Sequence, residues 1–383
     1  MKFTVDTKKL LEALSKINKI VAAKSDIPVY QDVLIEAKDK KVYLTGSNTV
    51  SRIRVNLPLE INAFDEGQCC VPASLLFDLV KTLDVTEVTL GFDEDKQILV
   101  INTSLKNSSF KLNCDMLSYP EWKSFNPTDK LRIEMSSFLK LIKETGYAAA
   151  PEKDHRNILK GVKLSFSPKE TVAIATDAYR ASRAVLDKGY VEKDTTFVLP
   201  VIGFKYLPSL FELDDTVEIQ AADNLIQFSD SSTVFITRTL EGNYPDRIDL
   251  MFEDHPESVS FDIKIQELTK LLNRASVLTK HSSVPLLTFS FDTQNESVEL
   301  ATKKVTTGNI KEELPLDKFV ASGNGYTICF NINYLLQVLR FSYDSKAKKI
   351  HFSFNDALRY FTITDADNPN SGLCQIISPV GAA

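Results

Sequence analysis

The sequence has little of what metal-binding and catalytic proteins are built from. Its five cysteines are odd in number and show no Cys-x-x-Cys spacing, so they predict reduced, buried thiols and neither a disulfide framework nor a zinc site. Four histidines, His155, His255, His281 and His351, are scattered with no second ligand type at metal spacing. No phosphate-binding loop, nucleophile elbow or dinucleotide fingerprint occurs. We therefore expect no catalytic residue, no metal and no cofactor.

Long apolar runs are also lacking. None reaches the roughly eighteen residues that a membrane span needs. The start, Met1-Lys2-Phe3-Thr4-Val5-Asp6, becomes polar too early for a secretory signal peptide. We expect a cytoplasmic protein with no membrane partner. The remaining composition, 43% hydrophobic and 25% charged, is ordinary for a globular chain and selects no function.

What the 383 residues do contain is a threefold repeat. A short strand leads into an amphipathic helix at 3–14, again at 131–142 and again at 260–272. We align Leu11, Leu139 and Leu268 as register mates. The spacing is too long for a solenoid unit of about 20 to 50 residues, so each copy should be a domain with its own core.

A second set of markers recurs in the same order. The stretch at 71–77 is echoed at 199–204 and at 330–336, where Asn331 stands in place of a proline. Pro72 and Pro200 are 128 positions apart, as are Leu11 and Leu139. Each copy therefore predicts a second helix that directly follows a strand.

Alternating apolar residues predict a strand hairpin in each copy, at 88–101, 217–228 and 350–364. Polar, proline-bearing stretches at 124–129 and 252–257 predict the boundaries between copies. We expect an α+β fold of three repeated domains, at 1–127, 128–253 and 254–383, each with two helices packed on antiparallel sheets. The short links predict a fixed row of domains, with the helices on the concave side of an arc.

The charge is unevenly distributed. The chain carries a formal net charge of −6, yet the six predicted helices hold eleven basic and four acidic residues, which leaves −13 for the rest. Basic side chains of the first helices are Lys8, Lys9, Lys16, Lys19, Lys140, Lys143, Lys270 and Arg274. Such a set favours contact with nucleic-acid phosphates, and it also fits a face that is only solvated.

Two motifs carry a resemblance to a known family. Residues 175–180, Ala-Thr-Asp-Ala-Tyr-Arg, and residues 241–246, Glu-Gly-Asn-Tyr-Pro-Asp, are similar to the A-T-D-[GS]-[HY]-R and [DE]-G-x-[FY]-P-D segments of bacterial DNA polymerase III beta subunits, the sliding clamps. With the repeats, the start at 1–5 and the turn at 44–48, the resemblance covers the full chain. It implies three clamp domains in a head-to-tail homodimeric ring. Such a ring encircles duplex DNA without reading its sequence and tethers the replicative polymerase as a processivity factor.

The resemblance also implies where DNA and the second copy bind. Lys24 and Lys153 fall on loops where the family contacts DNA, although both also fit solvated loop lysines. The seam between copies corresponds to a first-domain edge strand and a third-domain helix, with contact residues Phe110, Leu112, Val277 and Leu278. An isolated edge strand is a liability in a monomer, which supports a closed interface.

A partner pocket is implied between the second and third domains. In the family it takes short motifs of the Gln-Leu-x-Leu-Phe type from the polymerase, the clamp loader and repair proteins. Its positions here are Arg156, Leu159, Thr176, Tyr179, Arg180, Ala181, Pro245, Leu250, Asn331, Tyr334, Leu358, Tyr360, Ile377, Ser378, Pro379 and Val380. Leu159 and Pro245 fit an ordinary core between domains equally well.

Four departures from the family pattern leave alternatives open. Ala181 stands where a leucine is usual, Asp249 where an arginine is usual, Tyr360 where a small residue occurs, and 378–381 replaces a more apolar end. A specialised clamp paralogue that serves repair or a mobile element is one alternative. From another class, a three-domain nucleic-acid-processing enzyme with an unrecognised acidic site is the second.

Overall fold

The structure is a computed structural model. It describes residues 1–22, 24–58, 64–103, 109–114, 119–121, 129–222, 224–253, 258–280, 282, 285–303, 308–323, 325–343 and 347–380. The chain divides into two compact units. The first unit comprises Met1–Ser136 and Ile202–Thr239, and the second comprises Ser137–Val201 and Leu240–Ala383.

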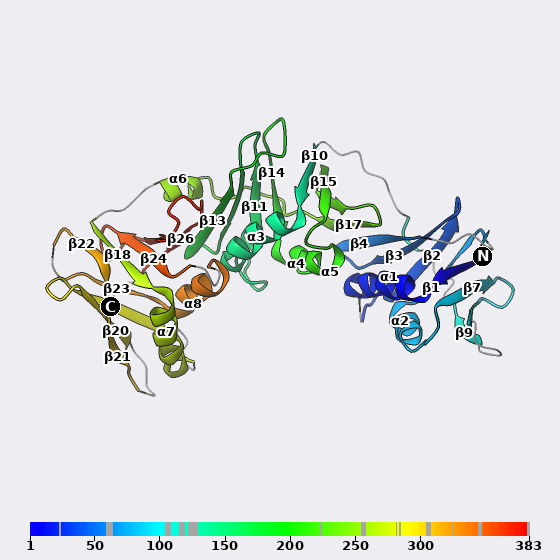
Figure 1. The fold of residues 1–383 in the computed structure, drawn as a ribbon, viewed down its shortest axis with the longest axis horizontal. Helices are drawn as coiled ribbons and strands as arrows, with labels where there is room; N and C mark the ends of the chain where they lie inside the picture. The colour runs from blue at the N-terminus through cyan, green and yellow to red at the C-terminus, as the bar shows by residue number, and fades with distance from the viewer. Residues whose placement is uncertain are drawn as a thin grey trace. The chain divides into compact units, whose positions relative to one another are not determined.

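The first unit contains two antiparallel sheets (Figure 1). The five-stranded sheet has the order β5 (Phe64–Asp65), β1 (Lys2–Asp6), β7 (Glu87–Asp93), β8 (Ile98–Thr103) and β9 (Ser109–Asn113). The eight-stranded sheet has the order β10 (Asp129–Glu134), β15 (Thr216–Ala222), β16 (Leu225–Ser229), β17 (Thr233–Arg238), β4 (Ser51–Leu57), β3 (Lys41–Ser47), β2 (Asp32–Lys38) and β6 (Gly67–Pro72). Helices α1 (Thr7–Ile20) and α2 (Ala73–Lys81) pack together, and α1 covers β3 and β4. The 3-10 helix η1 (Pro28–Gln31) precedes β2.

The second unit also contains two antiparallel sheets. The nine-stranded sheet has the order β14 (Thr195–Pro200), β11 (Gly161–Phe166), β12 (Thr171–Thr176), β13 (Arg180–Leu186), β26 (Cys374–Ile377), β25 (Phe361–Asp365), β24 (Lys349–Phe354), β18 (Val259–Lys264) and β22 (Asp317–Ala321). The four-stranded sheet has the order β21 (Lys311–Pro315), β20 (Ser297–Lys303), β19 (Leu286–Asp292) and β23 (Thr327–Asn331). The helices are α3 (Met135–Thr145), which enters this unit at Ser137, α6 (Ile248–Glu253), α7 (Ile265–Thr279), α8 (Ile332–Phe341), and the short 3-10 helices η2 (Gly146–Ala148) and η3 (Asn157–Lys160). Helix α7 packs on α8.

The threefold repeat is confirmed. Each copy opens with a strand that runs directly into a helix: β1 into α1, β10 into α3 (Met135–Thr145), and β18 into α7. Later, β6 leads into α2, β14 into α4 (Val201–Phe204) and β23 into α8. At the proline-equivalent position of the third copy, the Asn331 side chain caps α8. It accepts a hydrogen bond from the Asn333 amide at 3.0 Å. The predicted α+β class is therefore correct.

The register assigned to Leu268 is wrong by one residue. The strand positions Val5, Ile133 and Ile263 pair with the equivalent residues of β7, β15 and β24. Five residues further on, the aligned residues are Leu10, Phe138 and Leu268, and all three side chains are fully buried. Leu11 and Leu139 are mates of each other but are only half-buried. An apolar pair at adjacent helix positions made the sequence alignment ambiguous.

The second helix of the middle copy is interrupted. Two four-residue helices, α4 and α5 (Leu207–Leu210), stand where α2 and α8 are continuous. Pro208 lies in the first turn of α5 and has no amide proton to donate to the preceding turn, so a single helix cannot run through it.

The sheets join successive copies. In the first unit β17 pairs with β4, and in the second unit β13 pairs with β26, so each large sheet holds strands from two neighbouring copies. The predicted boundaries after residues 127 and 253 adjoin positions outside the described residues, and they stay predictions. Within the described ranges no helix is long and apolar enough to cross a membrane.

Candidate functional site

The motif at 175–180 builds the tight turn between β12 and β13. Thr176 Oγ1 donates to the Arg180 carbonyl at 2.6 Å and accepts from the Ala178 amide at 3.0 Å. Asp177 Oδ1 accepts from the amides of Tyr179 and Arg180 at 2.9 and 3.0 Å. Threonine and aspartate are needed here because their side-chain oxygens satisfy backbone groups that the turn leaves unpaired.

Arg180 is buried, with 8% of its surface exposed. Three of its guanidinium nitrogens donate hydrogen bonds. Nε donates to Asp177 Oδ2 at 3.1 Å, Nη2 to the Tyr147 carbonyl at 2.7 Å, and Nη1 to Gln337 Oε1. The ring of Tyr334 lies 4.5 Å from the guanidinium carbon. Arg180 therefore ties the β12–β13 turn to α8 within the second unit.

A cavity of about 220 Å³ opens beside this turn. Its apolar lining comes from Ala178, Ala181, Pro245, Ile248, Met251 and Ile376. Its polar lining comes from Thr176, Arg180, Arg247 and Ser378. An apolar hollow with a few converging polar groups is the usual form of a binding site in proteins.

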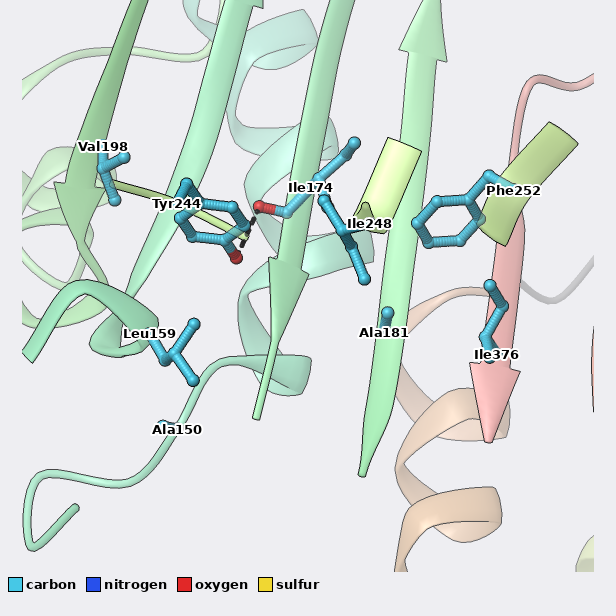
Figure 2. Packing of buried hydrophobic residues seen from close by; sticks show 9 residues of the cluster. All are labelled: Ala150, Leu159, Ile174, Ala181, Val198, Tyr244, Ile248, Phe252 and Ile376. Carbon is cyan, nitrogen blue, oxygen red and sulfur yellow. Dashed lines mark hydrogen bonds between the residues drawn. The ribbon is translucent and has the colours of Figure 1, made fainter. Parts of the chain in front are cut away.

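A buried cluster supports the walls of the cavity (Figure 2). Figure 2 shows Ala181 on β13 between Ile248 of α6 and Ile376 of β26, with Phe252 beside them. Tyr244 from the 241–246 motif donates its hydroxyl to the Ile174 carbonyl at 3.3 Å, and burial raises its pKa. The second motif thus positions α6 against the sheet.

The structure brings together part of the predicted pocket. Thr176, Arg180, Ala181, Pro245 and Ser378 line the cavity. Leu159 belongs to the cluster beneath it, and Tyr360 packs against that cluster from outside, so neither lines the cavity.

The remaining predicted pocket residues have other surroundings. Ile377 is fully buried and pairs with Arg180 across the sheet. Asn331 caps α8, and Pro379 is half-buried. Large apolar side chains that are exposed by 37% to 79% belong to Tyr179, Leu250, Leu358 and Val380.

Five cavity residues are absent from the sequence-based set: Ala178, Arg247, Ile248, Met251 and Ile376. Four of them lie inside the first motif or directly after the second, so extending the motifs by five residues would have found them. Ile376 lies next to Ile377 on β26, and its side chain points to the opposite face of the sheet. Applying the period of two along this strand would have identified Ile376 as the residue on the cavity side.

Arg156 is fixed close to the turn. It donates to both carboxylate oxygens of Asp154, at 3.0 and 2.8 Å, and to the Asp177 carbonyl at 3.1 Å. The Arg156 guanidinium holds the pKa of Asp154 well below its usual range. Such a bidentate pair fixes the orientation of a guanidinium.

Asp249, where the family pattern has an arginine, does not leave an isolated negative charge. Lys163 of β11 donates to its carboxylate at 2.8 Å. The two residues are 86 positions apart, which explains why sequence reading did not pair them.

The predicted DNA-contacting residues are mostly exposed. Exposed side chains are Lys8, Lys9, Lys19, Lys24, Lys140, Lys143, Lys153, Lys270 and Arg274. Lys16 is half-buried and donates to Thr233 Oγ1 at 3.0 Å. Arg274 forms an ion pair with Glu312, and Lys140 lies 3.8 Å from Glu144, so part of the basic excess is matched locally.

The predicted seam residues lie on an edge strand of the first unit and on a helix of the second unit. In the first unit β9 ends its sheet, with β8 as its one described strand neighbour. Leu112 of β9 is buried and Phe110 is half-buried. In the second unit α7 carries Val277, which is 70% exposed, and Leu278, which is half-buried.

No group of three or more potential metal ligands occurs among the residues that the structure describes. His351 instead contacts the buried Asp262 at 2.7 Å, and Lys318 lies 2.9 Å from the same carboxylate. His255 and His281 lie outside the described residues. All five cysteines carry reduced thiols; Cys114 and Cys374 are half-buried and the other three are buried.

Comparison with protein families finds three consecutive matches. Residues 1–123 match the N-terminal domain of the DNA polymerase III beta subunit, residues 132–246 the central domain, and residues 250–380 the C-terminal domain. The beta sliding clamp of Streptococcus pneumoniae strain R6 is 30% identical over 387 residues, covering 99% of this chain and 98% of the relative. The beta sliding clamp of Staphylococcus epidermidis strain RP62A is 24% identical with 99% of each covered.

Solved structures show the same fold. The DNA polymerase III beta chain of Streptococcus pneumoniae TIGR4 superposes with a TM-score of 0.89 at 27% identity, and all of each chain is covered. The DNA polymerase sliding clamp of Bacillus subtilis has a TM-score of 0.88 at 24% identity, again with full coverage of both chains.

Proposed function

The chain belongs to the DNA polymerase III beta subunit family over all three of its domains, and on that premise we propose how it acts as a DNA sliding clamp. It is a processivity factor that encircles duplex DNA and tethers the replicative polymerase. The observation that carries this conclusion is the match of all three domains in order. Nothing in the comparisons favours a repair-specific paralogue or a nucleic-acid-processing enzyme.

Two copies join head to tail into a ring of six domains. The seam forms between β9, with Phe110 and Leu112, and α7, with Val277 and Leu278. Val277 is 70% exposed on α7, so its apolar side chain is available for contact with a second copy. The unpaired edge of β9 supports it as well, since a closed ring removes exposed strand edges.

Duplex DNA passes through the ring in contact with basic helices. Lysines of α1, α3 and α7 attract phosphates without reading bases, and Lys24 and Lys153 add contacts from loops. A negative remainder of the chain disfavours DNA on other surfaces. The mechanism is topological, so it requires no covalent chemistry and no cofactor. The protein acts in the cytoplasm, where bacterial DNA is replicated.

Partner proteins bind through short peptides in the cavity beside the β12–β13 turn. The polymerase, the clamp loader and repair proteins would use the same site in turn. Eleven large apolar side chains of the described residues are strongly exposed, and four of them, Tyr179, Leu250, Leu358 and Val380, belong to the predicted pocket. Exposed apolar side chains at these positions are available to contact a bound peptide.

Salt titration of DNA binding tests the contact with phosphates. Binding of a linear duplex without a loader should be weak and should fall with added salt, with a log-log slope of about −0.9 per phosphate contact. Lys24→Ala combined with Lys153→Ala should make this slope shallower. The matched control removes the same charge from two exposed lysines outside the predicted DNA-contacting set, Lys41→Ala and Lys169→Ala. A slope that responds equally to both pairs, or binding that ignores salt, contradicts the proposed contact.

A further inference from the structure

We propose that Ala181 makes this cavity selective for a two-ring aromatic anchor, so that partner peptides carry a tryptophan where the generic motif ends in phenylalanine. The inference rests on the proposed function, because it assumes that the cavity receives a partner peptide. In this proposal a single residue, Ala181, determines which partner peptides bind in the cavity.

Size is the first argument. A closed apolar cavity of about 150 Å³ accommodates a single benzene ring. The cavity beside Ala181 measures about 220 Å³, which is roughly half as large again. A fused indole ring fills that additional space, whereas a phenyl ring leaves part of the lining without contact. Unfilled apolar space costs binding energy because the atoms around it lose their contacts.

The position of Ala181 is the second argument. Its side chain ends at the β-carbon, is 3% exposed, and lies between Ile248 and Ile376 (Figure 2). A leucine there would add three carbon atoms to the space that these two isoleucines flank. The residue at 181 therefore sets the depth of the cavity.

The lining chemistry agrees with an aromatic occupant. Ile248, Met251 and Ile376 supply aliphatic and thioether surface, and methionine sulfur packs favourably against aromatic rings. Arg180 cannot turn into the cavity to fill it, because its guanidinium is fixed by Asp177 and Tyr147. The hollow is thus preformed, and a rigid ring enters it at low conformational cost.

The test compares two peptides that differ only in the anchor, Gln-Leu-Asp-Leu-Phe and Gln-Leu-Asp-Leu-Trp, titrated by calorimetry into the full-length protein. The tryptophan peptide should bind about tenfold more tightly, since filling a hydrophobic pocket by a small group changes affinity by about 10- to 200-fold. In Ala181→Leu the preference should disappear or reverse. The control Ala321→Leu lies on β22, five strands from β13 in the same sheet and roughly 24 Å away, and should keep the wild-type preference.

Equal affinity of the two peptides for the wild-type protein would overturn the inference, as would a preference that survives Ala181→Leu. If that variant does not fold, judged by circular dichroism and solution mass, Ala181→Val should give an intermediate preference. Binding of neither peptide also overturns the inference. Clamp function itself is judged separately by retention on circular DNA, so its failure is distinguishable from that of the anchor preference.

Discussion

At the scale of single residues, Arg180 fixes the described part of the site through several contacts at once. Its charge is taken up by the buried Asp177, and its donors reach Tyr147 and Gln337 from two other elements. Stacking on Tyr334 completes its surroundings. Removing one member of a buried ion pair strongly destabilises the fold, because the other charge is then buried without compensation.

This leads to a prediction about coupling. Arg180→Ala and Asp177→Asn should each destabilise β13 and α8, with Arg180→Ala costing about 3–5 kcal/mol. The double variant should lose less than the sum by about 0.5–3 kcal/mol, because the two side chains act as one unit. Native-state hydrogen exchange of the amides in β13 and α8 measures both quantities in the second unit alone. Strictly additive losses would mean that the ion pair is incidental.

At the scale of elements, local patterns carried most of the information that the sequence held. Strand-to-helix junctions were predictable because a change of apolar period from two to 3.6 marks each one, as at Ile133 and Phe138. The cavity was predictable in part, because the two motifs contribute Thr176, Arg180 and Pro245.

What the sequence did not reveal depends on distant contacts. The pairing of β13 with β26 and the ion pair of Lys163 with Asp249 join residues far apart in the chain, and no local pattern encodes such pairings. Helix α6 is only six residues long and is stabilised by Ile248 and Phe252 on a buried cluster, so tertiary packing and not propensity determines it.

The seam between copies is tested at this scale. Val277→Asp with Leu278→Asp on α7 should give a folded monomer, since each apolar side chain contributes roughly 1.5–3 kcal/mol when fully buried in an interface. Light scattering should then report 42.9 kDa instead of twice that mass. The control is Val320→Asp on β22, which replaces another exposed apolar side chain of the same unit and should leave the dimer intact. A dimer that persists in the double variant would locate the seam elsewhere.

At the scale of the whole molecule, the chain combines a net charge of −6 with three helices, α1, α3 and α7, that together hold eight basic and three acidic residues. Such a distribution suits a protein that must hold DNA weakly in one place and move along it. Strong phosphate contacts would stop sliding, and the local pairing of Arg274 with Glu312 limits the attraction. The duration of attachment to DNA must then come from the closed ring and not from affinity.

The most direct measurement of this claim uses topology. The protein is assembled on a nicked circular plasmid with the clamp loader of the same organism, and the complex is separated from unbound protein by gel filtration at high salt, where electrostatic contacts are screened. A sliding clamp remains with the circular DNA and is lost once a single restriction cut makes the plasmid linear. Release from the intact circle by salt alone, or equal retention on circular and linear DNA, would contradict the account.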